Sequence, residues 1–256
     1  MGLRAALTLG IERANRRWVI VLGSVLALMT VFGGALVSLR LSNVGHTSSA
    51  QLVIITWCLA WGAGIFVAFG LASRAFIRDH QEGIADLFER HAKGQNAYLA
   101  ARIAGIAFIV ALVVGGAIGL SGLILILSSH QVAESGRALA ATLAALVYAL
   151  FFSITISPLA LCALGGRGRG SGYIVLLFCI GVPEMIARGA ARWIPASFID
   201  LISFPGALSA VRDSLLVGSI DPLRFVRASL VLAFAVGLSF LYLKREVTRT
   251  REGARR

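Results

Sequence analysis

The amino-acid sequence predicts an all-α integral membrane protein, and two observations carry that prediction. Hydrophobic residues make up 58% of the chain and charged residues only 14%, well below the roughly 25% charged residues of an average soluble domain. Several apolar segments also reach the about 20 residues that a helix needs to cross a bilayer. Because no segment shows the alternating pattern of an outer-membrane barrel strand, helices remain as the way to satisfy the backbone hydrogen bonds in lipid.

Six transmembrane helices are predicted within a single transmembrane domain, 1–256. Five of them are continuous apolar segments, and these are Trp18 to Leu39, Leu52 to Ala72, Ile103 to Leu127, Ala138 to Leu164 and Phe225 to Leu243. The other, from Ser171 to about Arg192, is interrupted by Pro183 and Glu184. About eleven residues precede Pro183 there, and a helix of that length extends only about 16 Å, which is too short to cross alone.

Basic residues predict the orientation of these spans. With both termini in the cytoplasm, 17 of the 24 Lys and Arg residues lie on the cytoplasmic side, as the positive-inside rule requires. Membrane orientation thus explains most of the net charge of +12, because the basic residues lie beside spans and lack interleaved aromatic residues. We expect a multi-pass protein of the bacterial inner (cytoplasmic) membrane that contacts lipid and binds no nucleic acid.

An amphipathic interfacial helix is predicted over residues 1–17. One helical stripe is apolar and leads to Trp18, while the arginines point elsewhere. The stripe consists of Leu3, Leu7, Ile11 and Ala14. Such a helix lies on the inner leaflet with arginines at the phosphate level and Trp18 as an anchor; a frayed basic tail is the alternative.

The charged segment 73–102 lies between the second and third spans. Ile84, Leu87 and Phe88 follow i, i+3, i+4 spacing, so a helix here carries one small apolar face among Asp, Glu and Arg residues. This pattern favours a cytoplasmic helix that docks on a partner protein. A helix that lies on the inner leaflet is the alternative.

The segment 183–224 is apolar but punctuated by prolines, and we expect re-entrant helices there, between spans five and six. Broken backbone at membrane depth must be buried in protein or line a wet cavity, so this segment is a candidate outer gate. Its candidate gate residues are Glu184, Arg188, Pro195, Phe204 and Pro205. Glu184 is expected to pair with Arg188 or to lie in a polar cavity, because an unpaired carboxylate there would cost several kcal/mol; an exposed surface helix is the alternative.

The order of these segments resembles the membrane (permease) subunit of a type-2 ABC exporter. Glu82-Gly83 followed by Ala85 to Phe88 is similar to the coupling segment of that family, and Arg102 to a basic residue that commonly opens span three. His91-Ala92 stands where many members have a proline. The resemblance implies that Glu82, Gly83, Ile84, Leu87 and Phe88 couple the chain to an ATPase.

The same resemblance implies the partners. A separate ATPase subunit in two copies would bind ATP and Mg, and a second permease subunit, identical or different, would complete a dimer with the substrate path between the two. The chain itself is not expected to be an enzyme, because it lacks the Gly-x-x-x-x-Gly-Lys-Ser/Thr loop that holds nucleotide phosphates. Export of a hydrophobic or amphipathic cargo is the expected function. Surfaces offered for dimerisation are Gly23, Gly33, Gly34, Phe204, Pro205 and Leu208, and packing within the chain is the alternative for the same residues.

Two alternatives come from other functional classes. Gly119-Leu120-Ser121-Gly122 matches the Gly-x-Ser-Gly motif of rhomboid intramembrane proteases, but such a serine needs a histidine base within hydrogen-bond reach. The only later histidine, His130, lies in an outer loop. A secondary transporter would show ionisable residues near mid-membrane, for which Glu184 and Arg188 are the candidate pair. No metal, cofactor or catalytic site is predicted on this chain, and its three cysteines are interpreted as small buried hydrophobes.

Overall fold

The computed structural model describes residues 8, 10–12, 14, 16–41, 48–83, 95–128, 132–165, 172, 174, 176–190, 193, 203–217 and 222–254. Within these residues all regular structure is helical, which confirms the predicted all-α class. The elements are, in chain order, α2 (Arg17–Leu41), α3 (Ser48–Cys58), the π-helical segment η2 (Leu59–Gly64), α4 (Ile65–Ala72), α5 (Ala75–Gln81), α7 (Gln95–Ser128), α8 (Val132–Leu164), the π-helical segment η3 (Leu177–Gly181), α10 (Val182–Ala190), α12 (Phe204–Leu216) and α13 (Pro222–Ala254).

Five helices of the described chain are long and apolar enough to cross a membrane, so the protein is a multi-pass membrane protein. They cover Arg17–Leu36, Gln51–Gln81, Gln95–Ser128, Glu134–Leu164 and Pro222–Arg245. These correspond to five of the six predicted spans. The interrupted span from Ser171 to Arg192 is described only in part, as η3 and α10 with residues 172, 174 and 176 before them.

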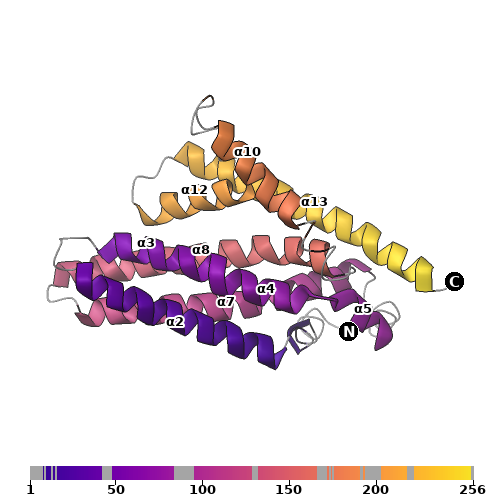
Figure 1. Cartoon of the computed structure of the whole chain (residues 1–256), viewed down its shortest axis with the longest axis horizontal. Coiled ribbons are helices and arrows are strands. Elements are labelled where there is room, and N and C mark those ends of the chain that lie inside the picture. Colours follow the sequence, from indigo (N-terminus) through magenta and orange to yellow (C-terminus); the bar gives the residue numbers. More distant parts are fainter. Residues whose placement is uncertain are drawn as a thin grey trace.

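The central pair of the bundle is α7 and α8, which pack along their lengths (Figure 1). The second span covers them from one side as a continuous rod of α3, η2 and α4, and α2 packs on the outside. Burial separates these three inner spans from the peripheral ones, because 50% of the apolar window of the second span and 44% of that of α7 and of α8 is buried, but only 22% of that of α2 and of α13. Large side chains with less than 2% exposure fill the centre, among them Tyr148, Phe152, Leu59, Ile106 and Leu161.

A second group of helices, α10, α12 and α13, leans away from this bundle (Figure 1). α12 and α13 pack on each other and both contact α8, which therefore joins the two groups. α12 begins with Ser203 as its N-cap, whose hydroxyl accepts a hydrogen bond from the Gly206 N–H at 2.9 Å. Pro205 fits the first turn because its missing N–H would have no partner there.

The N-terminal segment differs from the prediction. Residues 10–12 and 14 are helical, but Gly10 and Ala14, which is 1% exposed, are buried. A Cβ at Gly10 would collide with the Ala101 carbonyl, and a Cβ at Gly105 would collide with the Gly10 carbonyl. The Ala14 side of the predicted stripe is therefore buried in the protein, with Gly10 packed on α7. Leu3 and Leu7 lie outside the described residues.

The start of the third span also differs from the prediction. α7 begins at Gln95, eight residues before the predicted start at Ile103. Arg102 therefore lies two turns inside the helix, and it is 4% exposed. The added turns carry polar side chains that find partners on other helices, which the apolar pattern alone does not reveal.

Candidate functional site

Hydrogen bonds join several helices at one end of the bundle. This end, where Arg16, Arg74 and Lys244 lie, is called the basic end. Arg16 donates from Nη1 to the Gly70 carbonyl at 2.8 Å and from Nη2 to the Ser73 carbonyl at 3.1 Å, which links the start of α2 to the end of α4. Gln95 donates from Nε2 to the Lys244 carbonyl at 2.7 Å, which links the start of α7 to α13. The start of α2, the end of α4, the start of α7 and the part of α13 around Lys244 therefore come together near α5 (Figure 1).

The chain turns sharply between α4 and α5. Arg74 has a φ of 56°, in the left-handed region that residues other than glycine rarely adopt. The turn is held by two bonds from its backbone to the end of α8. The Arg74 N–H donates to the Leu164 carbonyl at 2.9 Å, and the Phe76 N–H donates to the Gly165 carbonyl at 3.0 Å. α5 is thereby fixed to the fourth span as well as to the second.

Asp79 on α5 is the centre of a buried polar cluster with Tyr98 and Arg102 of α7. Asp79 is 1% exposed, and Tyr98 and Arg102 are each 4% exposed. Tyr98 donates from Oη to Oδ2 at 2.5 Å, and Arg102 donates from Nε to Oδ2 at 2.5 Å and from Nη2 to Oδ1. The guanidinium thus grips both carboxylate oxygens, which is the strong bidentate geometry. This cluster fixes α5 to the third span.

The predicted coupling residues follow α5 directly. The Glu82 N–H donates to the Arg78 carbonyl at 2.9 Å and the Gly83 N–H to the His80 carbonyl at 3.1 Å, so both belong to the end of α5. Gly83 has a φ of 69° and thus ends the helix in the conformation that favours glycine at this position. Ile84, Leu87 and Phe88 lie outside the described residues. The segment 84–94 starts five residues after Asp79.

Glu184 joins α10 to α12. Its carboxylate accepts a hydrogen bond from Arg188 Nε at 2.9 Å, which is the predicted pair, and another from Ser203 Oγ at 2.7 Å. The Glu184 side chain is 25% exposed, whereas that of Arg188 is 80% exposed. Phe204 and Pro205 are buried in the first turn of α12, and Pro195 lies outside the described residues.

A cysteine at position 184 should react slowly with a membrane-impermeant maleimide, because Glu184 is largely covered while Arg188 is open. The measurement compares Glu184→Cys with Arg188→Cys as the matched control, one helical turn away, in a background that lacks the native cysteines. We expect labelling of position 188 to be complete well before that of position 184. Equal and rapid labelling at the two positions would remove the candidate gate role of Glu184.

A group of aromatic side chains lies beneath α12. The Arg212 guanidinium lies 4.7 Å from the centre of the Trp57 ring and donates from Nε and Nη2 to Asp213 Oδ1 at 2.9 and 2.6 Å. Trp57 in turn contacts Trp61 of η2, with ring centres 5.0 Å apart. Phe152 of α8 lies 6.3 Å from Trp61 and 6.5 Å from Tyr148. The group therefore connects α12 to the bundle core.

Three polar atoms in this region are buried without a hydrogen-bond partner in the described part of the chain: Thr56 Oγ1, Trp61 Nε1 and Tyr148 Oη. A buried donor or acceptor without a partner costs about 1–3 kcal/mol. They come from α3, η2 and α8, and η2 is a π-helical segment, a distortion that is frequent at functional sites. These three atoms can form hydrogen bonds with a polar group of a ligand that lies beside them.

The motifs singled out in the sequence behave as packing elements. Ser121 Oγ donates to the Ala117 carbonyl of its own helix at 2.9 Å, and a Cβ at Gly122 would collide with Thr142.

Cys58 is exposed on α3, which corrects the expectation that it is buried. In the described residues no group of three His, Cys, Asp or Glu side chains could hold a metal ion.

The surfaces offered for dimerisation are mostly used within the chain. A Cβ at Gly34 would lie 2.8 Å from Ile55, and one at Gly23 would collide with Val67, so both glycines pack α2 on the second span. Phe204, Pro205 and Leu208 are buried, with Leu208 at 0% exposure. Gly33 alone of the three glycines faces open space. A glycine pattern does not specify which neighbour packs on it, and dimerisation stays a prediction.

A comparison with protein-family models found no match, and a comparison with curated proteins found none either. The functional argument therefore depends on the geometry described above.

Proposed function

We propose that this chain is the membrane (permease) subunit of a type-2 ABC exporter that moves a hydrophobic or amphipathic cargo. The observation that carries the proposal is the buried Asp79–Tyr98–Arg102 cluster. It joins α5, the helix that leads into the segment expected to dock on an ATPase, to the third span. A surface helix without a mechanical role would not need a buried bidentate ion pair to hold it, because such pairs contribute little net stability compared with apolar packing.

In this mechanism, ATP binding closes a pair of ATPase subunits, and their movement is received by the segment 84–94. α5 passes the movement to three spans at once: to α7 through Asp79, to α8 through the backbone bonds at Leu164 and Gly165, and to α4 through the turn at Arg74. The Gln95 bond to the Lys244 carbonyl extends the connection to α13. Rearranged packing of these spans would open the path for cargo.

The course of the chain supports a sixth crossing. α8 ends at the basic end, where Leu164 accepts the Arg74 bond, and α13 begins at the other end and returns so that Lys244 lies beside Gln95 (Figure 1). A chain that follows this course would cross once more between residues 165 and 222, which supports the proposed sixth span. The interrupted segment through η3 and α10 is the one available for this crossing, and the basic end is the cytoplasmic one by the positive-inside rule.

The outer part of the proposed path is formed by α10, α12 and the aromatic group beneath α12. Thr56, Trp61 and Tyr148 would supply hydrogen bonds to the polar portion of an amphipathic cargo, and the aromatic faces would contact its apolar portion. Glu184 and Ser203 would hold the two outer helices together until the path opens.

Native mass spectrometry of the tagged chain, purified from its own membranes in mild detergent, tests this proposal. We expect a complex of two membrane subunits with two copies of an ATPase that carries the Gly-x-x-x-x-Gly-Lys-Ser/Thr motif. The distinction from a secondary transporter is direct, because such a protein works without an ATPase. The assignment is contradicted if the chain purifies without any ATPase at detergent concentrations that leave an ATPase bound to its membrane subunit.

A further inference from the structure

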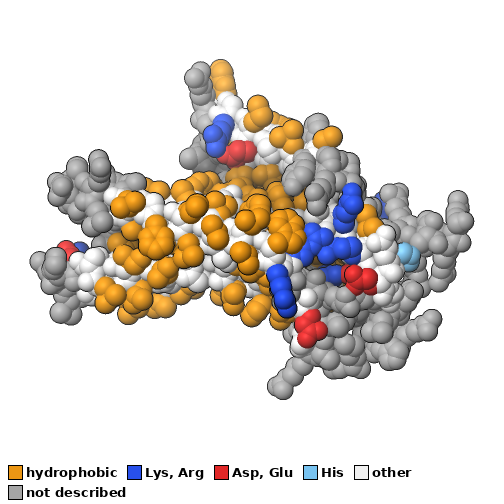
Figure 2. Space-filling view, turned by 60° about the horizontal axis from the view of Figure 1, so that its bottom comes forward, with side chains coloured by type: hydrophobic (Ala, Val, Ile, Leu, Met, Phe, Trp, Pro, Cys, Tyr) orange, Lys and Arg blue, Asp and Glu red, His pale blue; other side chains and the backbone are white. Residues whose placement is uncertain are grey.

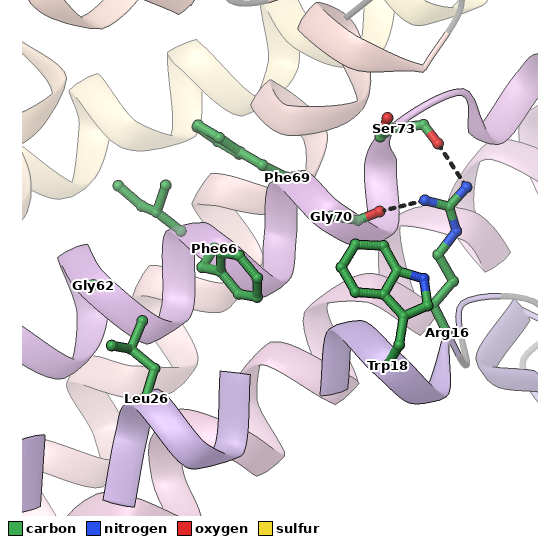
Figure 3. Close-up of a pocket in the computed structure, with 9 residues that line it drawn as sticks. Arg16, Trp18, Leu26, Gly62, Phe66, Phe69, Gly70 and Ser73 are labelled. Atoms are coloured by element: carbon green, nitrogen blue, oxygen red, sulfur yellow. Dashed lines mark hydrogen bonds between the residues drawn. The ribbon is translucent and has the colours of Figure 1, made fainter. Parts of the chain in front are cut away.

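An apolar groove lies between α2 and the rod formed by η2 and α4. It has a volume of about 450 Å³, within the range of about 300–1,000 Å³ that is usual for small-molecule sites. Its apolar lining includes Leu26, Ile65, Phe66 and Phe69. Figure 3 shows Leu26 facing Gly62 across the groove, while Arg16 and Trp18 lie at its basic end. The groove is open beside Gly62, because a Cβ added there would meet nothing within 4 Å.

The groove has the length of one membrane leaflet. From Arg16 to Leu26 is ten residues, or about 15 Å of helix. From Gly62 to Ser73, on the other wall, is eleven residues, or about 16 Å. The hydrocarbon core of a bilayer is about 30 Å thick, so each wall covers about half of it. One end lies at the level of Trp18, which is 55% exposed and suited to the headgroup region.

Two arginines converge at the headgroup end. Arg16 and Arg78 both donate to the carbonyl oxygen of Ser73, at 3.1 and 3.5 Å, so their positive charges lie close together. Arg17 and Arg74 are exposed beside them in the sequence. Lys and Arg side chains gather at the boundary between the apolar flank of the molecule and its basic end, with Asp and Glu side chains beside them (Figure 2). Close like charges repel each other, and an anion between them removes that repulsion.

We propose that this groove binds a phospholipid with an anionic headgroup, with an acyl chain along Phe66, Phe69 and Leu26 and the phosphate at Arg16 and Arg78. The occupant follows from the combination of an apolar channel one leaflet long, an interfacial tryptophan and a basic mouth. Binding would stabilise the packing of α2 on the second span at the basic end, where the movement of the proposed ATPase reaches the spans. This site is independent of the cargo and of the ATPase.

Lipid retention by the full-length chain in detergent tests the site. The chain is mixed with phosphatidylglycerol and phosphatidylcholine in equal amounts, delipidated stepwise and examined by native mass spectrometry. We expect one phosphatidylglycerol per chain to survive delipidation, and Gly62→Phe, which fills the groove, to abolish its retention. The matched control is Gly33→Phe, since Gly33 also faces open space but lies away from the groove.

The arginines provide a second test that leaves the groove itself unchanged. Arg78→Gln should lower retention of phosphatidylglycerol about fivefold, the usual effect of removing one basic residue at an anionic surface, and leave retention of phosphatidylcholine unchanged. Equal retention of the two lipids by the wild-type chain would overturn the proposal. So would equal retention of phosphatidylglycerol by Gly62→Phe and Gly33→Phe, or an Arg78→Gln chain with wild-type selectivity.

Discussion

Arg102→Ala is expected to destabilise the folded protein more than any other single substitution at the basic end. It would leave the carboxylate of Asp79, a residue that is 1% exposed, with the Tyr98 hydroxyl but without its guanidinium partner. Removal of one partner of a buried ion pair costs about 3–5 kcal/mol. Thermal unfolding of the purified chain, followed by the loss of its monodisperse peak in size-exclusion chromatography, should show a clearly lowered midpoint.

Two further variants separate the cause from a general effect of truncation. Arg102→Lys keeps the charge but cannot form the two-pronged contact with both carboxylate oxygens, so its midpoint should lie between those of the wild type and Arg102→Ala. The double variant Asp79→Leu with Arg102→Met removes both charges and should recover most of the stability. An Arg102→Ala chain that unfolds at the wild-type midpoint would contradict the buried-pair description.

Much of the membrane architecture follows from the apolar pattern of the sequence. The length and composition of the apolar segments predicted five helices that the structure contains, and α4 ends at Ala72, the residue at which the second span was predicted to end. The charge pattern predicted one basic end, where Arg16, Arg74 and Lys244 now lie on adjacent elements. These predictions succeed because a hydrocarbon environment imposes strict limits on length and polarity.

The buried cluster could not be predicted in the same way. Asp79 and Arg102 are 23 residues apart, and their contact depends on the reversal at Arg74. In the sequence, Arg102 was conspicuous as a basic residue near a span, but nothing identified its partner among several nearby acidic residues. One signal could have indicated the Asp79–Arg102 pair. Arg102 lies inside a segment that can be read as one long helix, and an acidic residue precedes it in the segment before that helix.

The packing partners of the small residues could not be predicted from the sequence either. Gly10 and Gly105 meet because the N-terminal segment approaches α7 closely, and Gly23 and Gly34 receive side chains of the second span. A glycine pattern predicts close approach but not the identity of the neighbour, because every small-residue face is compatible with several partners. The π-helical segment η2, which exposes Gly62 to the groove, likewise has no recognised sequence signal.

The second large effect is expected at the docking segment itself. Leu87→Asp combined with Phe88→Asp places two charges on the apolar face formed with Ile84, so an apolar contact with the ATPase should be lost. The spans and the Asp79–Arg102 cluster lie outside this face, and membrane insertion should be unaffected. Asp86→Ala combined with Glu89→Ala is the matched control, because those two residues lie on the polar side of the same predicted helix.

Co-purification of the ATPase with these two double variants tests the central claim, that the segment after α5 receives the movement of an ATPase. The amounts of both chains are measured after affinity purification of the tagged membrane subunit in mild detergent. We expect the Asp86→Ala, Glu89→Ala variant to retain the wild-type amount of ATPase and the Leu87→Asp, Phe88→Asp variant to retain none above background. Full retention of the ATPase by the Leu87→Asp, Phe88→Asp variant would contradict the docking role and with it the proposed route of coupling.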